Sequence, residues 1–273
     1  MMSRGQGCGV RPGPHKAMGR DQGAALLNVF KNILTSASLG GILLLNTFKT
    51  MPAAKIAKSD QTSLKILEAA LDLFREQGFE AATMRAIAER AQVATGAAYY
   101  YYPSKEAIVM DFYRRSCEEM QSKLEAALQD AKGLEIRLRA LIQVKLEHFA
   151  PNRGVLRALL RNGADPRHPL SPFSPETQAI RDIDIGWFQR SLTDCGVRIP
   201  RDLEPALPGV LWFLQMGVIF FWVIDESPRQ ARSAKLLERA VKSAVVLIRL
   251  SGLPLMRPVR KSALEIIELV KGA

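Results

Sequence analysis

Apolar residues recur every three or four positions along most of the chain from about residue 59 onward. Leu64, Leu67, Leu71 and Phe74 follow one another at intervals of three, four and three, which places them on one face of an α-helix over residues 62–77. The same period predicts helices over residues 83–91, 95–101, 104–128, 133–149, 155–161, 176–195, 203–224, 231–250 and 263–270, with a four-proline loop at 163–175. Because the sequence shows no strand-like alternation, the predicted fold class is all-α.

The ends of the first predicted helices carry the residues that favour helix termini. Thr62, Thr83 and Ser104 stand where an N-cap hydroxyl is expected. Gly78 follows the first helix at the position that favours a left-handed stop. Pro103 ends the third helix, because proline disfavours helical backbone in the residue before it.

The segment at residues 208–224 is apolar almost without interruption. It is 17 residues long, contains Gln215 and is followed by Asp225 and Glu226, whereas a single membrane span needs about 20 apolar residues. A helix that is apolar on all sides must be buried. We therefore expect no membrane insertion and predict that this helix and the helix at 231–250 form half of a four-helix homodimer interface.

Residues 83–102 have the pattern of a helix-turn-helix. Two short helices flank the tight turn at residues 91–94, and the second helix combines small side chains with four adjacent tyrosines. A helix that enters the major groove must be slim and must present polar tips and methyl groups to base edges. Thr95 provides such a hydroxyl, Ala97 provides a methyl group, and tyrosine hydroxyls reach phosphate oxygens. These features favour binding to double-stranded DNA.

Three segments resemble the N-terminal DNA-binding domain of TetR-family transcriptional regulators. They read ILEAALDLFREQGF at residues 66–79, TMRAIAERAQV at 83–93 and GAAYYYYPSKEA at 96–107. The resemblance covers about 45 residues of the chain. It implies a ligand-responsive regulator, most often a repressor, that binds a pseudo-palindromic operator as a dimer and is released by a small apolar effector.

The resemblance also assigns roles to individual residues. Thr83 would cap its helix and contact phosphate, Thr95 and Ala97 would face the bases, and Tyr99 and Lys105 would bind the backbone. The complete predicted DNA-binding set is Thr83, Arg85, Thr95, Gly96, Ala97, Tyr99, Tyr100 and Lys105. This chain departs from the family pattern at four positions, where Ala86, Gln92, Ala94 and Thr95 stand in place of an acid, a glycine, a small hydroxyl and a lysine.

The remainder of the chain is predicted to bind the effector and to dimerise. We divide the chain into an N-terminal extension at 1–58, a DNA-binding domain at 59–115 and a helical effector and dimerisation domain at 116–273. Candidate pocket residues are the aromatic and neighbouring side chains of the predicted helices: His148, Phe149, Trp187, Phe188, Trp212, Phe213, Gln215 and Met216. Gln215, Asp182, Asp184 and His168 are the polar groups that could orient a ligand in an apolar pocket.

Charge adds little to the DNA-binding hypothesis. The net charge is +11, but residues 51–115 hold nine Lys and Arg against eight Asp and Glu. Residues 1–50 have a charge of +5 without a continuous apolar core, so we interpret them as a disordered extension or as sequence upstream of a true start at Met51 rather than as a targeting signal. The argument for DNA therefore depends on where the polar residues lie.

The remaining composition favours a cytoplasmic protein without a metal or cofactor. Three separated cysteines and three separated histidines form no disulfide framework and no metal-binding pair. A helical enzyme is one alternative, but no catalytic triad, phosphate-binding loop or dinucleotide fingerprint occurs in the sequence, so we predict no enzymatic activity. A second alternative is an interaction protein that keeps this DNA-binding domain but no longer binds an operator.

Overall fold

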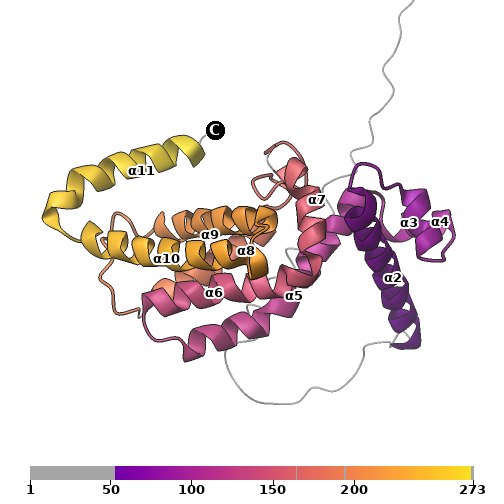
Figure 1. Cartoon of the computed structure of the whole chain (residues 1–273), viewed down its shortest axis with the longest axis horizontal. Helices are drawn as coiled ribbons and strands as arrows, with labels where there is room; N and C mark the ends of the chain where they lie inside the picture. The colour runs from indigo at the N-terminus through magenta and orange to yellow at the C-terminus, as the bar shows by residue number, and fades with distance from the viewer. Residues whose placement is uncertain (1–52, 164, 194, 272–273) are drawn as a thin grey trace, which may run out of the picture. The chain divides into compact units, whose positions relative to one another are not determined.

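The computed structural model describes residues 53–163, 165–193 and 195–271, and the regular elements in these ranges are helices. Figure 1 shows them in chain order. They are α2 (Ala53–Gln77), α3 (Met84–Arg90), α4 (Thr95–Tyr101), α5 (Lys105–Asp130), α6 (Leu134–Phe149), η1 (Ala150–Asn152), α7 (Arg153–Gly163), α8 (Gln178–Leu192), α9 (Leu207–Ile224), η2 (Pro228–Gln230), α10 (Ala231–Ser251), η3 (Pro254–Met256) and α11 (Arg257–Lys271). The all-α prediction is confirmed for the described residues.

The first helix differs from its prediction at one end and agrees at the other. Helix α2 begins at Ala53, so Thr62 lies inside the helix and the prediction of an N-cap there was wrong. The alanine and lysine residues at 53–58 are good helix formers and extend the helix backwards. Of the predicted extension at 1–58, residues 53–58 are therefore helical, and the prediction for 1–52 lies outside the described residues. Gly78 ends the helix with a φ of +87° and donates its N–H to the Phe74 carbonyl at 3.1 Å.

Helices α2, α3 and α4 surround a small apolar core that the start of α5 completes. We call these three helices and the start of α5 the head. Phe74, Ile87, Ala98 and Ile108 from these four helices are fully buried in it. The same core also takes in three residues from farther along the chain, Val155, Leu159 and Leu170. The core of the head therefore extends to α7 and the loop after it, beyond the boundary that we predicted at residue 115.

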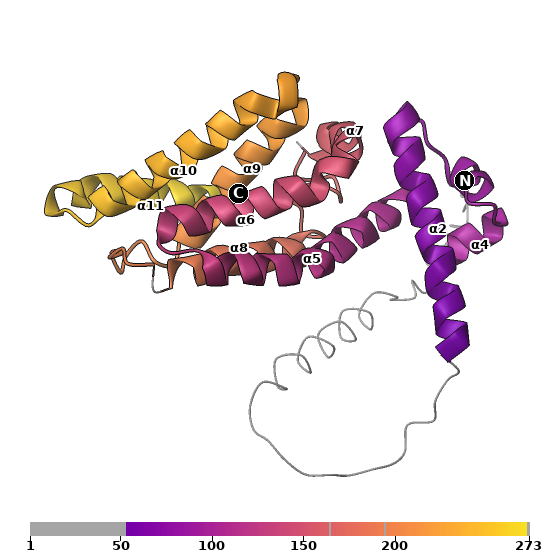
Figure 2. The same cartoon turned by 60° about the horizontal axis from the view of Figure 1, so that its bottom comes forward.

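A second core lies among α5, α6, α8, α9 and α10. Leu141 of α6, Phe188 of α8, Leu211 of α9 and Val241 of α10 are among its buried residues. Helix α5 contacts α6 and α8, and α9 contacts α8 and α10, as Figure 2 shows from a second direction. Since α5 passes through both cores, one continuous helix connects the head with the C-terminal domain.

The turn between α9 and α10 is held by one carboxylate. Asp225 Oδ2 accepts hydrogen bonds from the Ser233 hydroxyl at 2.6 Å and the Ser233 N–H at 2.9 Å, and its Oδ1 accepts from the Ser227 N–H at 2.9 Å. These hydrogen bonds, that from the Ser233 hydroxyl first, lower the pKa of Asp225 far below its usual range. The carboxylate therefore satisfies a free N–H in the first turn of α10 and ties that turn to the end of α9.

Helix α9 combines a buried face with an exposed apolar face. Its buried side includes Leu211, Trp212, Val218 and Trp222, and its exposed side includes Val210, Phe213, Phe221 and Ile224. Among the described residues it is the one helix with the length and apolar composition of a membrane span, and 44% of that span is buried within the chain. Such values also fit the core helix of a globular domain, so they carry no membrane assignment.

The last helix, α11, is longer than predicted because it begins at Arg257 rather than near residue 263. Arg260 fixes its first turn, since its guanidinium lies 3.1 Å from the Asp202 carboxylate and donates to the Ser251 carbonyl. Helix α8 is shorter at both ends than the predicted 176–195, and α9 begins four residues later than the predicted 203.

Candidate DNA-binding and effector sites

The helix-turn-helix of the head is formed by α3 and α4. The Thr83 hydroxyl accepts a hydrogen bond from the Ala86 N–H at 3.1 Å and caps α3, as predicted. The turn that follows places Gln92 at a φ of +56°, a left-handed conformation that favours glycine. At the end of the turn, the Val93 N–H donates a hydrogen bond to the Ala88 carbonyl at 2.9 Å. This turn fixes the angle at which α4 leaves α3.

Helix α4 divides its side chains between a buried and an exposed face. Ala98 has no exposed surface and packs into the core of the head. Tyr99 and Tyr100 are 52% and 83% exposed. Thr95 and Gly96 at the start of the helix are also exposed, as are Thr83 and Arg85 of the preceding cap and helix, whereas Ala97 is half-buried. Six of the eight predicted DNA-binding residues are therefore exposed on the helix-turn-helix.

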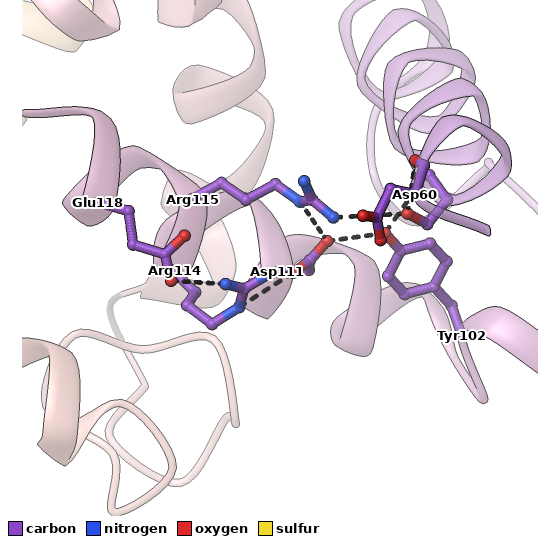
Figure 3. A network of polar contacts seen from close by, with 7 residues as sticks. Asp60, Tyr102, Asp111, Arg114, Arg115 and Glu118 are labelled. Atoms are coloured by element: carbon purple, nitrogen blue, oxygen red, sulfur yellow. Dashed lines mark hydrogen bonds and ion pairs between the residues drawn. The ribbon is translucent and has the colours of Figure 1, made fainter. Parts of the chain in front are cut away.

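The end of α4 is tied to α2 and α5 by a polar network, which Figure 3 shows. Tyr102 is buried, and its hydroxyl donates to Asp111 Oδ2 at 2.7 Å. Arg115 and Arg114 also bind the Asp111 carboxylate, at 2.7 Å and 2.5 Å, and Arg115 reaches the Ser63 hydroxyl of α2 at 3.4 Å. The network holds the helix that we expect to enter the groove at a fixed position on the head.

The pKa values of two network members follow from these contacts. Burial, followed by the hydrogen bond to Asp111, raises the pKa of Tyr102 to about 12. Burial alone would raise the pKa of Asp111, but hydrogen bonds from Arg115, Tyr102 and Arg114 keep it below its usual range. The tyrosine is therefore a neutral donor and the aspartate an ionised acceptor at neutral pH.

Lys105 is the eighth predicted DNA-binding residue, and the structure gives its ammonium partners within the protein. Its Nζ donates to the Phe79 carbonyl at 2.8 Å and to the Glu80 carbonyl at 3.3 Å. The same group lies 4.6 Å from the centre of the Phe79 ring. Lys105 thus fixes the loop between α2 and α3 to the start of α5.

A second candidate site is an apolar cavity of about 140 Å³ in the C-terminal domain. Its wall comes from α5, α6, α7, α8, α9 and the loop that follows α7. The lining residues are Tyr113, Cys117, Met120, Lys145, Phe149, Leu156, Leu159, Leu160, Gly163, Leu170, Pro172, Thr177, Ile180, Arg181, Asp184, Trp212, Met216, Ile219, Phe220 and Val223. Leu159 and Leu170 also belong to the core of the head, so the cavity wall and the head share side chains.

The predicted pocket residues divide between the cavity wall and other places. Phe149, Trp212 and Met216 line the cavity. Trp187 and Phe188 lie instead in the second core, and Phe213 is half exposed and stacks on Phe173. His148 is not among the lining residues, and its Nε2 lies 3.8 Å from Glu119. Helical spacing placed these aromatic residues on the right helices without indicating which side of each helix faces the cavity.

Gln215 lies behind the cavity wall in a group of buried polar side chains. Its side chain is fully buried and donates from Nε2 to Asp184 Oδ2 at 3.3 Å. Asp184 Oδ1 lies 2.6 Å from the ammonium of Lys145, a side chain that is only 2% exposed. Asp184 was among the polar candidates, but the sequence analysis missed Lys145. A signal existed, because Lys145 continues the apolar face of α6 from Leu138 and Leu141 at helical spacing.

Two further polar residues of the wall are neutral at neutral pH. Burial, with a smaller effect of the Asp184 charge, raises the pKa of Cys117 to about 12. Burial also raises the pKa of Tyr113 above its usual range. The other side chains of the wall with an acidic or basic group are Lys145, Arg181 and Asp184. Among the described residues no group of three or more His, Cys, Asp or Glu side chains is arranged to bind a metal ion.

Comparison with protein families identifies the class of this protein. The family model described as "Bacterial regulatory proteins, tetR family" matches residues 66–111, and the model "Tetracyclin repressor-like, C-terminal domain" matches residues 137–264. The two matches together cover more than half of the chain. The chain belongs to the TetR family of transcriptional regulators, as the three sequence segments predicted.

Similar proteins are known by sequence and by structure. The chain is 38% identical over 81 residues to the HTH-type transcriptional repressor KstR of Rhodococcus jostii, and 41% identical over 63 residues to KstR of Mycolicibacterium smegmatis. These alignments cover 27% and 23% of this chain but only 38% and 31% of the two repressors. The matched part of the chain thus spans about a third of the length of each relative.

Two solved structures share the fold. FadR from Bacillus subtilis, in complex with stearoyl-CoA, has a TM-score of 0.52 at 18% identity, with 65% of this chain and 97% of that chain covered. GusR from Salmonella enterica has a TM-score of 0.53 at 19% identity, with 74% and 98% covered. At this level of identity the similarity concerns the fold alone.

Proposed function

We propose that this protein is a cytoplasmic, dimeric transcriptional repressor that binds a pseudo-palindromic operator and is released from it by a small apolar effector. The observation that supports this most strongly is the exposed face of α4. The buried Tyr102 at the end of that helix is hydrogen-bonded to Asp111 within the same domain. Thr95, Ala97 and Gly96 would face base edges, because small and hydroxyl side chains let a helix approach the major groove closely. Arg85, Thr83, Tyr99, Tyr100 and Lys105 would bind phosphate and fix the register.

A dimer would place two copies of α4 on the two halves of the operator. Val210, Phe213, Phe221 and Ile224 recur along α9 at helical spacing and are all exposed, and the exposed Val246, Leu247 and Leu250 lie on the neighbouring α10. Exposed apolar side chains on two neighbouring helices are costly in water and are typical of a subunit interface. Helices α9 and α10 from two subunits would then form a four-helix interface.

The effector would act through the wall that the cavity shares with the head. Helix α7 packs on α2. The two helices approach closely at Gly154, where an added Cβ would lie 3.0 Å from the Arg75 side chain. A ligand larger than the 140 Å³ cavity must displace its wall, and the volume corresponds to roughly one benzene-sized molecule. Displacing α7 would move α2, and an effector can release DNA only as far as it binds the displaced state more tightly.

The DNA-binding proposal is tested by titrating duplexes from the protein's own promoter region at low salt, with Thr95→Lys as the informative variant. An added cation on a helix that faces phosphate should tighten binding and steepen the dependence of log K on log salt by about 0.9. Thr193→Lys is the matched control, because Thr193 is an exposed threonine at the end of α8. No duplex binding by the unaltered protein, or equal effects of the two substitutions, would contradict the proposal and favour the interaction protein without an operator.

A further inference from the structure

We propose that the effector is an amphipathic carboxylic acid, whose ionised carboxylate binds Lys145 and Arg181 while its apolar body fills the cavity. The inference rests on the proposed function, because it specifies the chemical class of the effector. It is carried by the charged side chains in the cavity wall, Lys145, Arg181 and Asp184, which the apolar lining alone does not explain.

Lys145 is a buried cation whose ammonium has more N–H donors than it has partners. Its side chain is 2% exposed, and its Nζ approaches Asp184 Oδ1 to 2.6 Å. This ion pair engages one of the three N–H donors of the ammonium, and no further hydrogen-bond acceptor is recorded for Nζ among the described residues. A buried donor without an acceptor is costly. Because Lys145 forms part of the cavity wall, a ligand oxygen in the cavity can supply the missing acceptor.

Arg181 adds a second cation to the same wall. Its Nη1 donates to the Pro172 carbonyl at 2.7 Å and to the Ser174 carbonyl at 3.2 Å, and its guanidinium lies 6.0 Å from the centre of the Trp212 ring. These partners are neutral, and no carboxylate in the described ranges forms an ion pair with it. Lys145 and Arg181 therefore face the cavity with only Asp184 to balance them, so the wall has one excess positive charge.

An excess cation in an apolar cavity selects for an anion. Coulomb attraction is stronger where the surroundings are apolar and water is excluded, and hydrogen bonds between charged partners are about twice as strong as neutral ones. A neutral ketone or alcohol could accept a hydrogen bond from Lys145 but would leave the excess charge unpaired. A single carboxylate does both, whereas a dianion would leave a negative charge in excess.

The rest of the wall fits an apolar body attached to that carboxylate. Five further wall residues carry no ionisable group: Leu156, Leu160, Met216, Ile219 and Phe220. Cys117 is a neutral thiol, because burial raises its pKa to about 12. A second charge on the body would meet only apolar side chains and would be strongly disfavoured. The ligand therefore has one acidic end and one apolar end.

Binding of the carboxylate would change the contacts between helices. Lys145 belongs to α6, Asp184 and Arg181 to α8, and Gln215 to α9, so one ion pair and one hydrogen bond connect three helices. A ligand carboxylate competes with Asp184 for Lys145 and leaves Asp184 to Gln215. The same ligand that fills the cavity would thus loosen α6 from α8 next to α7, which contacts the head.

The experiment compares matched acids and alcohols on the full-length protein without DNA. The probes are octanoate against 1-octanol and 3-phenylpropanoate against 3-phenylpropan-1-ol, with affinity measured by titration calorimetry and by the fluorescence of Trp212 in the wall. We expect at least one acid to bind about tenfold or more tightly than its alcohol, as for hydrogen bonds to charged groups. Equal affinities within both pairs, or no binding by either acid, overturns the inference.

Variants test whether the preference comes from the named residues. Arg181→Gln removes the excess charge without breaking the pair of Lys145 and Asp184, and we expect the preference for the acid to fall severalfold. Lys145→Gln together with Asp184→Asn removes both partners of the pair and should abolish the remaining preference; Lys235→Gln, at an exposed lysine of α10, should not change it. If the variants fold, as shown by circular dichroism, and keep the preference, the carboxylate does not bind at Lys145 and Arg181.

Failure of this inference can be distinguished from failure of the proposed function. Ligand binding is measured without DNA, and duplex binding is measured without ligand. A protein that binds its operator but does not prefer the acids refutes the effector class and leaves the repressor proposal intact. A protein that prefers the acids but binds no duplex refutes the repressor and leaves the carboxylate site intact.

Discussion

The head and the C-terminal domain differ in how completely their buried polar groups are satisfied. In the head, the buried Tyr102 hydroxyl donates to Asp111, and the half-buried Lys105 ammonium donates to two carbonyls. In the C-terminal domain, Arg139 Nε and Gln215 Oε1 are buried without a hydrogen-bond partner, and the buried Lys145 ammonium has only its ion pair with Asp184 among the described residues. The same domain contains the apolar cavity and most of the exposed large apolar side chains.

The difference shows which part of the molecule is complete by itself. A buried polar network that is fully satisfied fixes one geometry, whereas a partly satisfied one is unfavourable until another group completes it. The head needs one geometry, because a displaced α4 would no longer match a groove. The C-terminal domain has donors, an acceptor, a cavity and an apolar face, which the proposed ligand and the proposed second subunit would complete.

The largest effect is expected from removing a large side chain in each of the two cores. Phe74 has no exposed surface and packs 5.1 Å from the Phe79 ring, so Phe74→Ala should lower the free energy of unfolding by about 3–5 kcal/mol. Met216 already borders the cavity, so Met216→Ala removes fewer contacts and should cost about 2 kcal/mol or less, at or below the lower end for buried methionine.

Urea denaturation followed by circular dichroism measures both values. Duplex binding separates the two further, since Phe74→Ala should abolish it at 37 °C while Met216→Ala keeps it. Equal losses of stability for the two variants would show that the C-terminal domain is packed as tightly as the head and would remove the basis of the comparison.

The next effect concerns the network that holds α4. Asp111→Asn removes the charge that Tyr102, Arg114 and Arg115 share, and we expect a loss of about 1–3 kcal/mol in the free energy of unfolding. Asp72→Asn is the control, because the pair of Asp72 and Arg75 is about half exposed on both sides and such pairs contribute about 0–1 kcal/mol.

The pH dependence of the unfolding free energy provides an independent test of the same polar network. Since the folded-state pKa of Asp111 lies below its usual value, its contribution is fully present above the unfolded pKa of about 3.9 and is lost as the pH falls through the folded value. Between about pH 5 and pH 3, the range around that unfolded pKa, the unfolding free energy of Asp111→Asn should therefore fall less than that of the unaltered protein. Parallel pH profiles would mean that the carboxylate does not stabilise the head.

The sequence predicted the head more fully than the effector site, for a physical reason. Caps, stops and turns depend on residues close in sequence, so Thr83, Gly78 and Ser104 could be recognised, and both N-caps accept the expected N–H bonds. The error at Thr62 came from the same local rule, because a hydroxyl inside a good helix-forming segment looks like a cap. Local patterns do not reveal that Val155 and Leu159 complete the core of the head.

The cavity depends on contacts that no local pattern encodes. Its wall takes residues from five helices and a loop, and helical periodicity does not give the rotation of each helix about its axis. Phe149, Trp212 and Met216 were therefore found, whereas Trp187 and Phe188 proved to be core. Lys145 could have been noticed as a cation on the apolar face of α6, but its partner Asp184 lies on another helix.

A smaller effect in the opposite direction is expected at the turn between α3 and α4. Gln92 adopts a φ of +56°, a conformation that costs a residue with a Cβ roughly 1–2 kcal/mol. Gln92→Gly removes this strain but adds freedom to the unfolded chain, so the net gain in the free energy of unfolding should be about 0.5–1 kcal/mol. Gly78→Ala, at a φ of +87° with no atom within 4 Å of the added Cβ, should destabilise through the backbone alone. A loss of stability in Gln92→Gly would show that the glutamine side chain contributes more than the strain.

The smallest effect is expected from His148 in the C-terminal domain. Burial lowers the pKa of His148, while Glu119 acts in the opposite direction and Lys123 in the same direction. A histidine with a depressed folded-state pKa binds its proton more readily in the unfolded chain, so stability is retained above the unfolded pKa of about 6.5 and decreases as the pH falls below it. His148→Gln should flatten the stability profile between roughly pH 7 and pH 5, measured by urea denaturation at constant ionic strength. If the profile keeps its slope, the buried face of α6 tolerates the imidazolium, and the C-terminal domain is more open to water at this point than the side chain's 12% exposure indicates.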